Sequence, residues 1–192
     1  MSTLTDAERI VLLKLARSVI ESEIIKNKSI IRPREISPAL NEKRGCFVTL
    51  HQNEALRGCI GTIEPAKPLI SCVEENAVNA AFRDPRFSPL DKDELTTVDI
   101  EISVLTVPRQ LEFKDGEDLK EKLKPGIHGV ILSQGYRRAT FLPQVWEQLP
   151  EKEAFLGHLC QKGSMAKKAW LDRETKVEVY EAEYFSEKQL IP

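Results

Sequence analysis

Apolar residues recur at helical spacing near the start of the chain. In a helix these residues would lie on one face, and further apolar residues next to them would broaden that apolar face. The residues at this spacing are Ile10, Leu13, Ile20 and Ile24. Thr5 and Glu8 match a capping box, in which each side chain satisfies a backbone donor at a helix start. The pattern predicts a largely buried helix that ends before the polar run 26–28.

The next patterned segments predict a hairpin and a second helix. Residues 46–51 and 55–63 have strand-like composition and flank the polar turn 52–54. Pro68 suits a first helical position, and an apolar stripe then continues to about Phe82. Because Asp84 precedes a proline, its backbone is disfavoured in the helical region, so the helix should end before it.

The second half of the chain is dominated by strand signals. Residues 98–104 alternate strictly between apolar and polar, which predicts a strand with one buried and one exposed face. Residues 126–132 and 137–142 predict a second hairpin, 151–162 a helix, and 175–185 a last strand. Strands and helices do not alternate regularly, so we expect an α+β fold with a mostly antiparallel sheet flanked by helices, in one domain over 1–192.

Composition narrows the class of protein. The 192 residues are 41% hydrophobic and 30% charged with a formal net charge of −2, as in an ordinary globular protein. We expect no nucleic-acid binding, since this charge balance does not suit a phosphate-backbone binder. No segment is long and apolar enough to span a membrane, and the N-terminus lacks a signal-peptide pattern. We therefore expect a cytoplasmic protein with four free thiols and no membrane association.

The candidate chemistry centres on Arg57 and Cys59, which lie among Gly58 and Gly61 in a strand-like stretch. In a regular strand the two side chains point to the same face. A cation beside a cysteine favours the thiolate, and glycines allow a substrate, a ligand or another backbone to come close. Cys59 is therefore a candidate catalytic thiol, with Arg57, Gly58 and Gly61 as candidate substrate-binding residues. The alternative is a buried cysteine that packs as a small hydrophobe.

Two further groups join the candidate site. His128, between Gly126 and Gly129, could serve as the base for a thiol, or it could be a histidine that is hydrogen-bonded within the sheet. Arg83, Asp84 and Arg86 are candidate ligands for an anionic substrate, since arginine presents a planar fork to carboxylate or phosphate. Asp84 could instead bridge the arginines and hold the loop.

Several motifs are missing from the sequence. It contains no Walker pattern, no dinucleotide-binding glycine motif, no nucleophile-elbow motif and no zinc-protease motif. The cysteines and histidines also lack the spacing of a structural zinc site. The sequence therefore predicts no cofactor and no metal.

The stretch from Leu56 to Thr62 resembles the signature of the AMMECR domain family, also called protein A of the AmmeMemoRadiSam system. The resemblance continues through 45–50, 80–87, 101–105, 126–129 and 141–145. It implies an α+β fold with a larger and a smaller lobe, and a cleft between them where the signature lies. It also implies a Memo-like protein and a radical S-adenosylmethionine protein as candidate partners.

Two functions follow from these residues and this resemblance. In the first, the protein is an enzyme or enzyme component that uses Cys59 on a small anionic substrate. In the second, it is a non-catalytic module that binds a small anion or a protein partner and serves as a scaffold for the other components.

Overall fold

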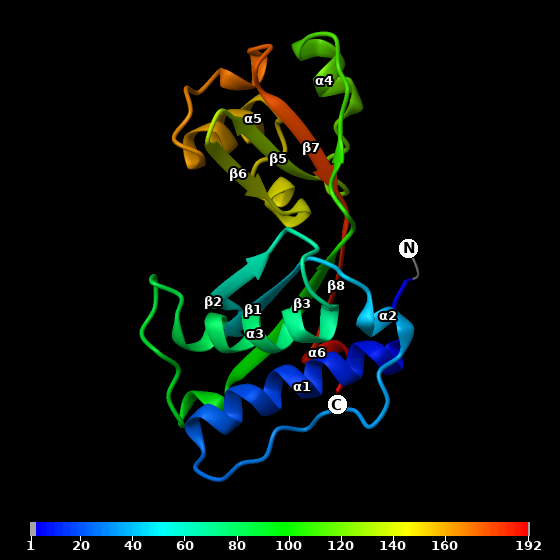
Figure 1. Ribbon diagram of the computed structural model, residues 1–192. Helices are drawn as coiled ribbons and strands as arrows, with labels where there is room; N and C mark the ends of the chain where they lie inside the picture. The colour runs from blue at the N-terminus through cyan, green and yellow to red at the C-terminus, as the bar shows by residue number, and fades with distance from the viewer. Residues whose placement is uncertain (1–2, 192) are drawn as a thin grey trace. The chain divides into compact units, whose positions relative to one another are not determined.

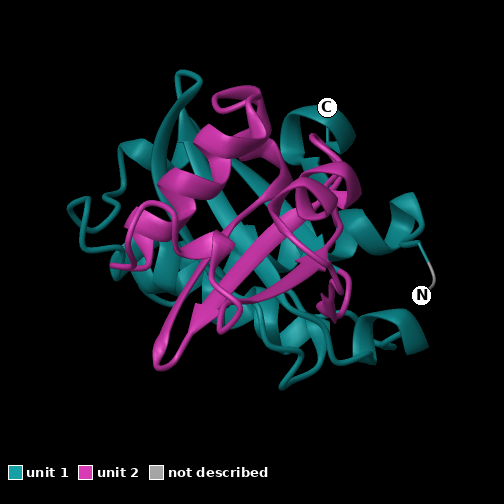
Figure 2. Ribbon diagram, turned by 90° about the horizontal axis from the view of Figure 1, so that it is seen from above, with its two compact units in different colours: residues 1–105, 183–192 teal, residues 106–182 magenta. Residues whose placement is uncertain are grey.

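A computed structural model describes residues 3–191, and the chain forms two compact units. Unit 1 contains the residues up to Leu105 and those from Glu183 onward, while unit 2 is Thr106–Ala182 (Figure 2). In sequence, unit 2 is therefore an insertion between the two segments that form unit 1.

Unit 1 is built on a four-stranded sheet with the strand order β2-β1-β3-β8. Its strands are β1 (Cys46–Gln52), β2 (Ala55–Thr62), β3 (Val98–Leu105) and β8 (Ala182–Ser186). Its helices are α1 (Asp6–Ile24), α2 (Pro38–Asn41), α3 (Leu69–Phe82) and α6 (Glu187–Leu190), and the 3-10 turn η1 spans Glu94–Thr96. Because β2 is at one end of the order, one of its edges has no neighbouring strand.

Helices α1 and α3 pack together and cover one face of this sheet (Figure 1). The alternate residues of β1 and β3 that face these helices are completely buried. They include Val48, Leu50, Ile100 and Ile102. The residues between them, such as Thr49 and Glu101, point to the other face of the sheet. The hydrophobic core of unit 1 thus lies between the sheet and the two helices.

The hairpin of β1 and β2 contains a bulge at Arg57. Thr49 pairs with Cys59 and Leu50 with Gly58, but His51 pairs with Leu56, which leaves Arg57 as an extra residue. Such a bulge shifts the register by one residue and exchanges the faces to which the following side chains point. As a result Gly58 and Ile60 face the helices, whereas Cys59 shares the opposite face with Thr49.

Unit 2 contains a second four-stranded sheet with the order β4-β7-β5-β6. Its strands are β4 (Arg109–Gln110), β5 (Gly129–Gln134), β6 (Arg137–Phe141) and β7 (Lys176–Tyr180). Its helices are α4 (Gly116–Lys122) and α5 (Lys152–Lys162), with the 3-10 turns η2 (Pro143–Glu147) and η3 (Ala169–Leu171). The rings of Trp146 and Phe155 stack with centroids 3.6 Å apart in its core.

The α+β class, the antiparallel pairing and most predicted elements are confirmed. Helix α1 begins with the predicted capping box, and the strands at 46–52 and 98–105 and the helix at 152–162 lie where the patterns placed them. Strand β5 begins at Gly129, so residues 126–128 lie in the turn before it.

One predicted strand is wrong. The segment 175–185 is divided at Glu181 into β7 and β8, which belong to different sheets. The hydroxyl of Thr106 accepts the backbone N–H of Glu181, and the Glu181 carbonyl accepts the backbone N–H of Thr106. These two bonds satisfy the backbone N–H and C=O of Glu181, the residue at which the chain changes sheets.

Among the described residues, no helix combines the length and hydropathy needed to cross a membrane.

Gly58 provides a test of this packing. A Cβ at position 58 would lie 2.3 Å from the backbone oxygen of Ala80 in α3, so Gly58→Ala must push the helix away from the sheet. We expect a loss of about 1–3 kcal/mol in the free energy of unfolding, measured by denaturant titration. Gly157→Ala is the matched control, because its Cβ would meet Lys167 no closer than 3.4 Å within a helix. An equal loss in both variants would contradict the close approach at Gly58.

Candidate functional site: a clamped thiol on an edge strand

The thiol of Cys59 lies on the face of the unit 1 sheet that points away from α1 and α3. Thr49 is its cross-strand partner, and the Thr49 hydroxyl donates a hydrogen bond to the Cys59 sulfur at 3.2 Å. Thr49 is buried, whereas Cys59 is only half-buried. The alternative of a cysteine packed in the hydrophobic core therefore does not describe Cys59.

A buried carboxylate holds the backbone of Cys59. The Asp84 side chain is 2% exposed, and one of its oxygens accepts the backbone N–H of Cys59 at 2.9 Å. The same carboxylate accepts bonds from the backbone N–H, Nε and Nη2 of Arg86 at 3.1, 2.9 and 2.7 Å. The Arg86 Nη2 group also donates to the carbonyl oxygen of Cys59 at 3.1 Å. Asp84 and Arg86 thus bind both backbone polar groups of Cys59.

This arrangement explains how the free edge of β2 is satisfied. At an edge strand, every second residue directs its N–H and C=O away from the sheet, and unpaired groups of this kind are sites of unwanted pairing. At Cys59 these two groups meet a side-chain acceptor and a side-chain donor instead of another strand. The segment after α3 therefore caps the edge of the sheet next to the thiol.

Arg57 does not accompany the thiol, which corrects the expectation that it keeps Cys59 charged. Its guanidinium forms a fork with Glu94, with Nε and Nη2 at 2.6 and 2.8 Å from the two carboxylate oxygens. Nη2 also donates to the Ser88 carbonyl at 3.0 Å. The bulge turns Arg57 out of the regular alternation, and its contacts fix the 88–94 segment. A role of Arg57 in substrate binding stays a prediction.

The pKa of the Cys59 thiol is raised, because burial disfavours the thiolate. The Thr49 hydrogen bond and the positive charge of Arg86 act in the opposite direction, while the negative charges of Asp84 and Glu101 add to the rise. The thiol is therefore mostly protonated at neutral pH. The cation that acts on it is Arg86 rather than Arg57.

The two glycines of the signature lie where the backbone or side chain of a neighbouring residue comes close. Gly58 lies against the backbone of α3, as described above. A Cβ on Gly61 would lie 2.2 Å from the ring of Phe47, its cross-strand partner. Both positions need glycine because protein atoms occupy the space of a side chain.

The register also brings together residues that the sequence reasoning missed. Thr49 pairs with Cys59 on one side and with Glu101 of β3 on the other, so all three side chains share a face. His51 lies on the same face, with its Nε2 4.0 Å from a Glu101 oxygen, a contact that becomes an ion pair when His51 is protonated. The polar positions of the alternating strand 98–104 were the available signal for Glu101.

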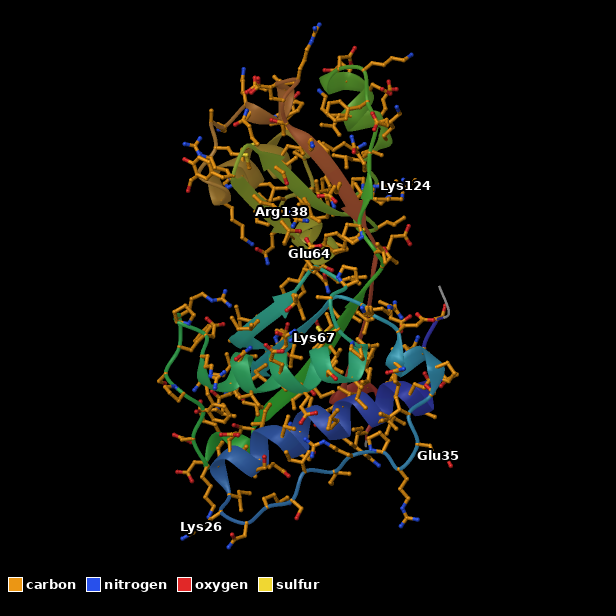
Figure 3. The ribbon with its side chains drawn as sticks, viewed as in Figure 1. Lys26, Glu35, Glu64, Lys67, Lys124 and Arg138 are labelled. Atoms are coloured by element: carbon orange, nitrogen blue, oxygen red, sulfur yellow. The ribbon has the colours of Figure 1, made fainter. Side chains whose placement is uncertain are left out.

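His128 lies in unit 2, whereas Cys59 lies in unit 1, so their pairing stays a prediction. The His128 side chain is buried, and its Nδ1 accepts the backbone N–H of Lys124, which Figure 3 labels, at 3.3 Å. Burial lowers the pKa of His128, and the positive charge of Arg109 adds to this effect. The imidazole is therefore neutral at physiological pH, and within the described residues its Nε2 has no hydrogen-bond partner.

Two observations complete the site. Arg83 is exposed and donates to the Asn79 side chain at 3.2 Å, so Asp84 joins Arg86 to Cys59 but does not bridge the two arginines. No group of three or more histidine, cysteine or acidic side chains within residues 3–191 is arranged to hold a metal ion.

These features define an α+β protein in which a buried carboxylate positions a half-buried thiol on the edge strand of an antiparallel sheet. The chain belongs to the AMMECR1 family, whose model matches residues 13–185. The match extends over both compact units, so the family relationship concerns the whole fold rather than the signature alone.

Relatives of the chain have similar lengths. Protein Mbar_A1807 of Methanosarcina barkeri is 40% identical over 97% of this chain and 93% of its own length. Protein MJ0810 of Methanocaldococcus jannaschii is 38% identical over 97% and 94%, respectively. The crystal structure of the uncharacterized protein PH0010 from Pyrococcus horikoshii is similar with a TM-score of 0.85 and 37% identity, covering 93% of this chain and 91% of that one.

The pH dependence of alkylation tests the electrostatics of the thiol. Because the pKa of Cys59 is raised, we expect its reaction with iodoacetamide to reach half-maximal rate above the pH of about 8.5 that an ordinary thiol shows. Arg86→Ala removes the charge that favours the thiolate and should move the midpoint further up. Arg83→Ala is the matched control and should leave it unchanged. Peptide mass spectrometry follows Cys59 separately, and a wild-type midpoint below 8.5 would contradict the assignment.

Proposed function

We propose that unit 1 binds a small anionic molecule beside Cys59, and that the Cys59 thiol acts on it as a nucleophile or proton donor. The observation that carries the proposal is the clamp formed by Asp84 and Arg86. It fixes both backbone polar groups of Cys59 and places a guanidinium beside a half-buried thiol. The clamp thus holds the backbone that carries the thiol, and it brings the charge of Arg86 to bear on that thiol.

Arg86 is the residue best suited to meet the anion. Its side chain is 53% exposed although three of its bonds are directed to Asp84, so part of the guanidinium faces solvent. Arginine binds carboxylate and phosphate groups through such planar edges. Asp84 is fully engaged and would position Arg86 rather than touch the ligand. Arg83, which is exposed nearby in the sequence, stays a candidate second contact.

Because the pKa of Cys59 is raised, a nucleophilic role of its thiol requires a base. A protonated thiol becomes a nucleophile only when a base removes its proton. Glu101 and His51 share the face of the sheet with Cys59 and are candidates for that base, in addition to His128. The ligand would then approach from this face, where the thiol, the hydroxyl of Thr49 and the carboxylate of Glu101 are adjacent.

The same raised pKa favours a second candidate function, a non-catalytic module that binds a small anion. In that case the Cys59 thiol only contributes to the shape of the site. The partners implied by the family resemblance, a Memo-like protein and a radical S-adenosylmethionine protein, belong to either version of the proposal. The enzyme version would supply a product to them, and the module version would deliver a bound ligand.

Two alkylating reagents of similar size test anion binding. Iodoacetate is anionic and iodoacetamide is neutral, so the ratio of their rates at Cys59 reports local attraction of an anion. We expect this ratio to exceed that of glutathione by about three- to fivefold, the effect of one unit charge at contact distance in water. Arg86→Ala should abolish the excess, whereas Arg83→Ala should retain most of it. An equal ratio for Cys59 and glutathione would contradict an anion site.

Substrate trapping separates the two versions. Wild-type protein and Cys59→Ser are purified from the cells in which they occur, and the small acids released on denaturation are identified by mass spectrometry. The enzyme version predicts that Cys59→Ser accumulates an acid that the wild type converts. The same acid in equal amounts on both proteins would support the module, and no acid on either would count against both.

A further inference from the structure

Two buried cysteines meet in the core of unit 1, apart from the site of Cys59. Cys46 is the first residue of β1, and Cys72 lies in the first turns of α3. Both are at most 1% exposed, and their sulfur atoms are 3.0 Å apart, with the Cys46 thiol donating a hydrogen bond to Cys72. Both are free thiols in the structure.

Asn76 completes this cluster. Its side-chain amide donates to the Cys72 sulfur at 3.3 Å and to the backbone oxygen of Cys46 at 3.3 Å, and it lies 3.6 Å from the Cys46 sulfur. Asn76 is itself buried, and it is one helical turn beyond Cys72 on the same face of α3. It therefore holds the strand and the helix at the separation that keeps the sulfurs in contact.

We propose that Cys46 and Cys72 form a dithiol–disulfide site, which a small-molecule disulfide oxidises to a covalent link between β1 and α3. A disulfide bond is about 2.0 Å long, so the two sulfur atoms need to approach by only about 1 Å. The proposal requires that rotations of the two side chains supply this approach.

The chemistry assigns different roles to the two thiols. The pKa of Cys72 is lowered, because its sulfur accepts the hydrogen bond of Cys46, and the positive charge of Lys67 (labelled in Figure 3) adds to this effect. Burial raises the pKa of Cys46. Cys72 is therefore the group that attacks, and Cys46 is the group that resolves the intermediate.

The reaction balances in two steps. The Cys72 thiolate attacks one sulfur of the small disulfide, breaks its S–S bond and releases one thiolate, which leaves a mixed disulfide on Cys72. Cys46 loses its proton, attacks the Cys72 sulfur and releases the second thiolate. The protein loses two protons and two electrons, and the small disulfide takes up both to become two thiols. Because both cysteines are buried, the oxidant enters when α3 opens locally or before it packs during folding.

The bond would affect the site of Cys59 through chain connectivity. Cys46 and Cys72 are 26 positions apart, and the segment between them contains the β1–β2 hairpin with Cys59. Helix α3 leads from Cys72 to the Asp84–Arg86 clamp. The link would therefore join the two elements whose relative placement determines the geometry of the clamp.

The test begins with reduced wild-type protein, which is unfolded and refolded with oxidised glutathione. Peptide mapping without reductant should show Cys46 linked to Cys72, with Cys59 and Cys160 outside the link. The oxidised protein should melt roughly 5–10 °C higher than the reduced protein, as expected for a closed loop of this length in a domain of this size. Cys72→Ala should lose the oxidation-dependent shift, whereas the control Cys160→Ala should retain it.

Two results would overturn the proposal. One is a refolded protein in which Cys46 and Cys72 stay unlinked while Cys59 forms a mixed disulfide with glutathione. The other is a link that joins either of them to Cys59 or Cys160. Because the mapping is performed on the wild-type chain, both results remain readable if a variant fails to fold.

Discussion

The single extra residue at Arg57 determines the face of the sheet on which the candidate site lies. The two-residue turn at Asn53 and Glu54 would, in a regular hairpin, place Val48 opposite Cys59 and direct the thiol toward the core. The bulge shifts the pairing by one residue, so that Thr49 lies opposite Cys59 and Gly58 faces α3. The fork between Arg57 and Glu94 anchors the bulged residue. If Arg57 were instead paired in regular register, Cys59 would face the core and Gly58 would face the other side of the sheet.

The second constraint is the unpaired edge of β2. Asp84 and Arg86 bind the outward N–H and C=O of Cys59, so the segment after α3 takes the place of a neighbouring strand. The buried Asp84 carboxylate has a strongly lowered pKa, chiefly because of its hydrogen bonds with Arg86. The pair therefore remains charged over the physiological range. Edge protection and thiol positioning are consequently one and the same interaction, which links the stability of unit 1 to the geometry of its candidate site.

The sequence predicted the elements better than the contacts of the site. Helix α1 and strand β3 have long, strongly periodic patterns, and local rules describe them well. The bulge at Arg57 leaves no mark in the hydrophobic pattern, and for that reason the regular alternation assigned Arg57 to the face of Cys59. The fork to Glu94 and the clamp by Asp84 depend on contacts between residues 25 or more positions apart. The strand 175–185 was predicted as one element because nothing at Glu181 interrupts its pattern.

The most direct test of this account is a nuclear Overhauser measurement of the β1–β2 register in the wild-type protein. Directly opposite residues whose N–H and C=O groups point away from each other bring their Cα atoms to about 4.5 Å, which gives a strong cross-peak between their Hα atoms. We predict such a cross-peak between Thr49 and Cys59. A register in which Val48 lies opposite Cys59 would contradict the bulge, and with it the placement of the thiol on the face that points away from α1 and α3.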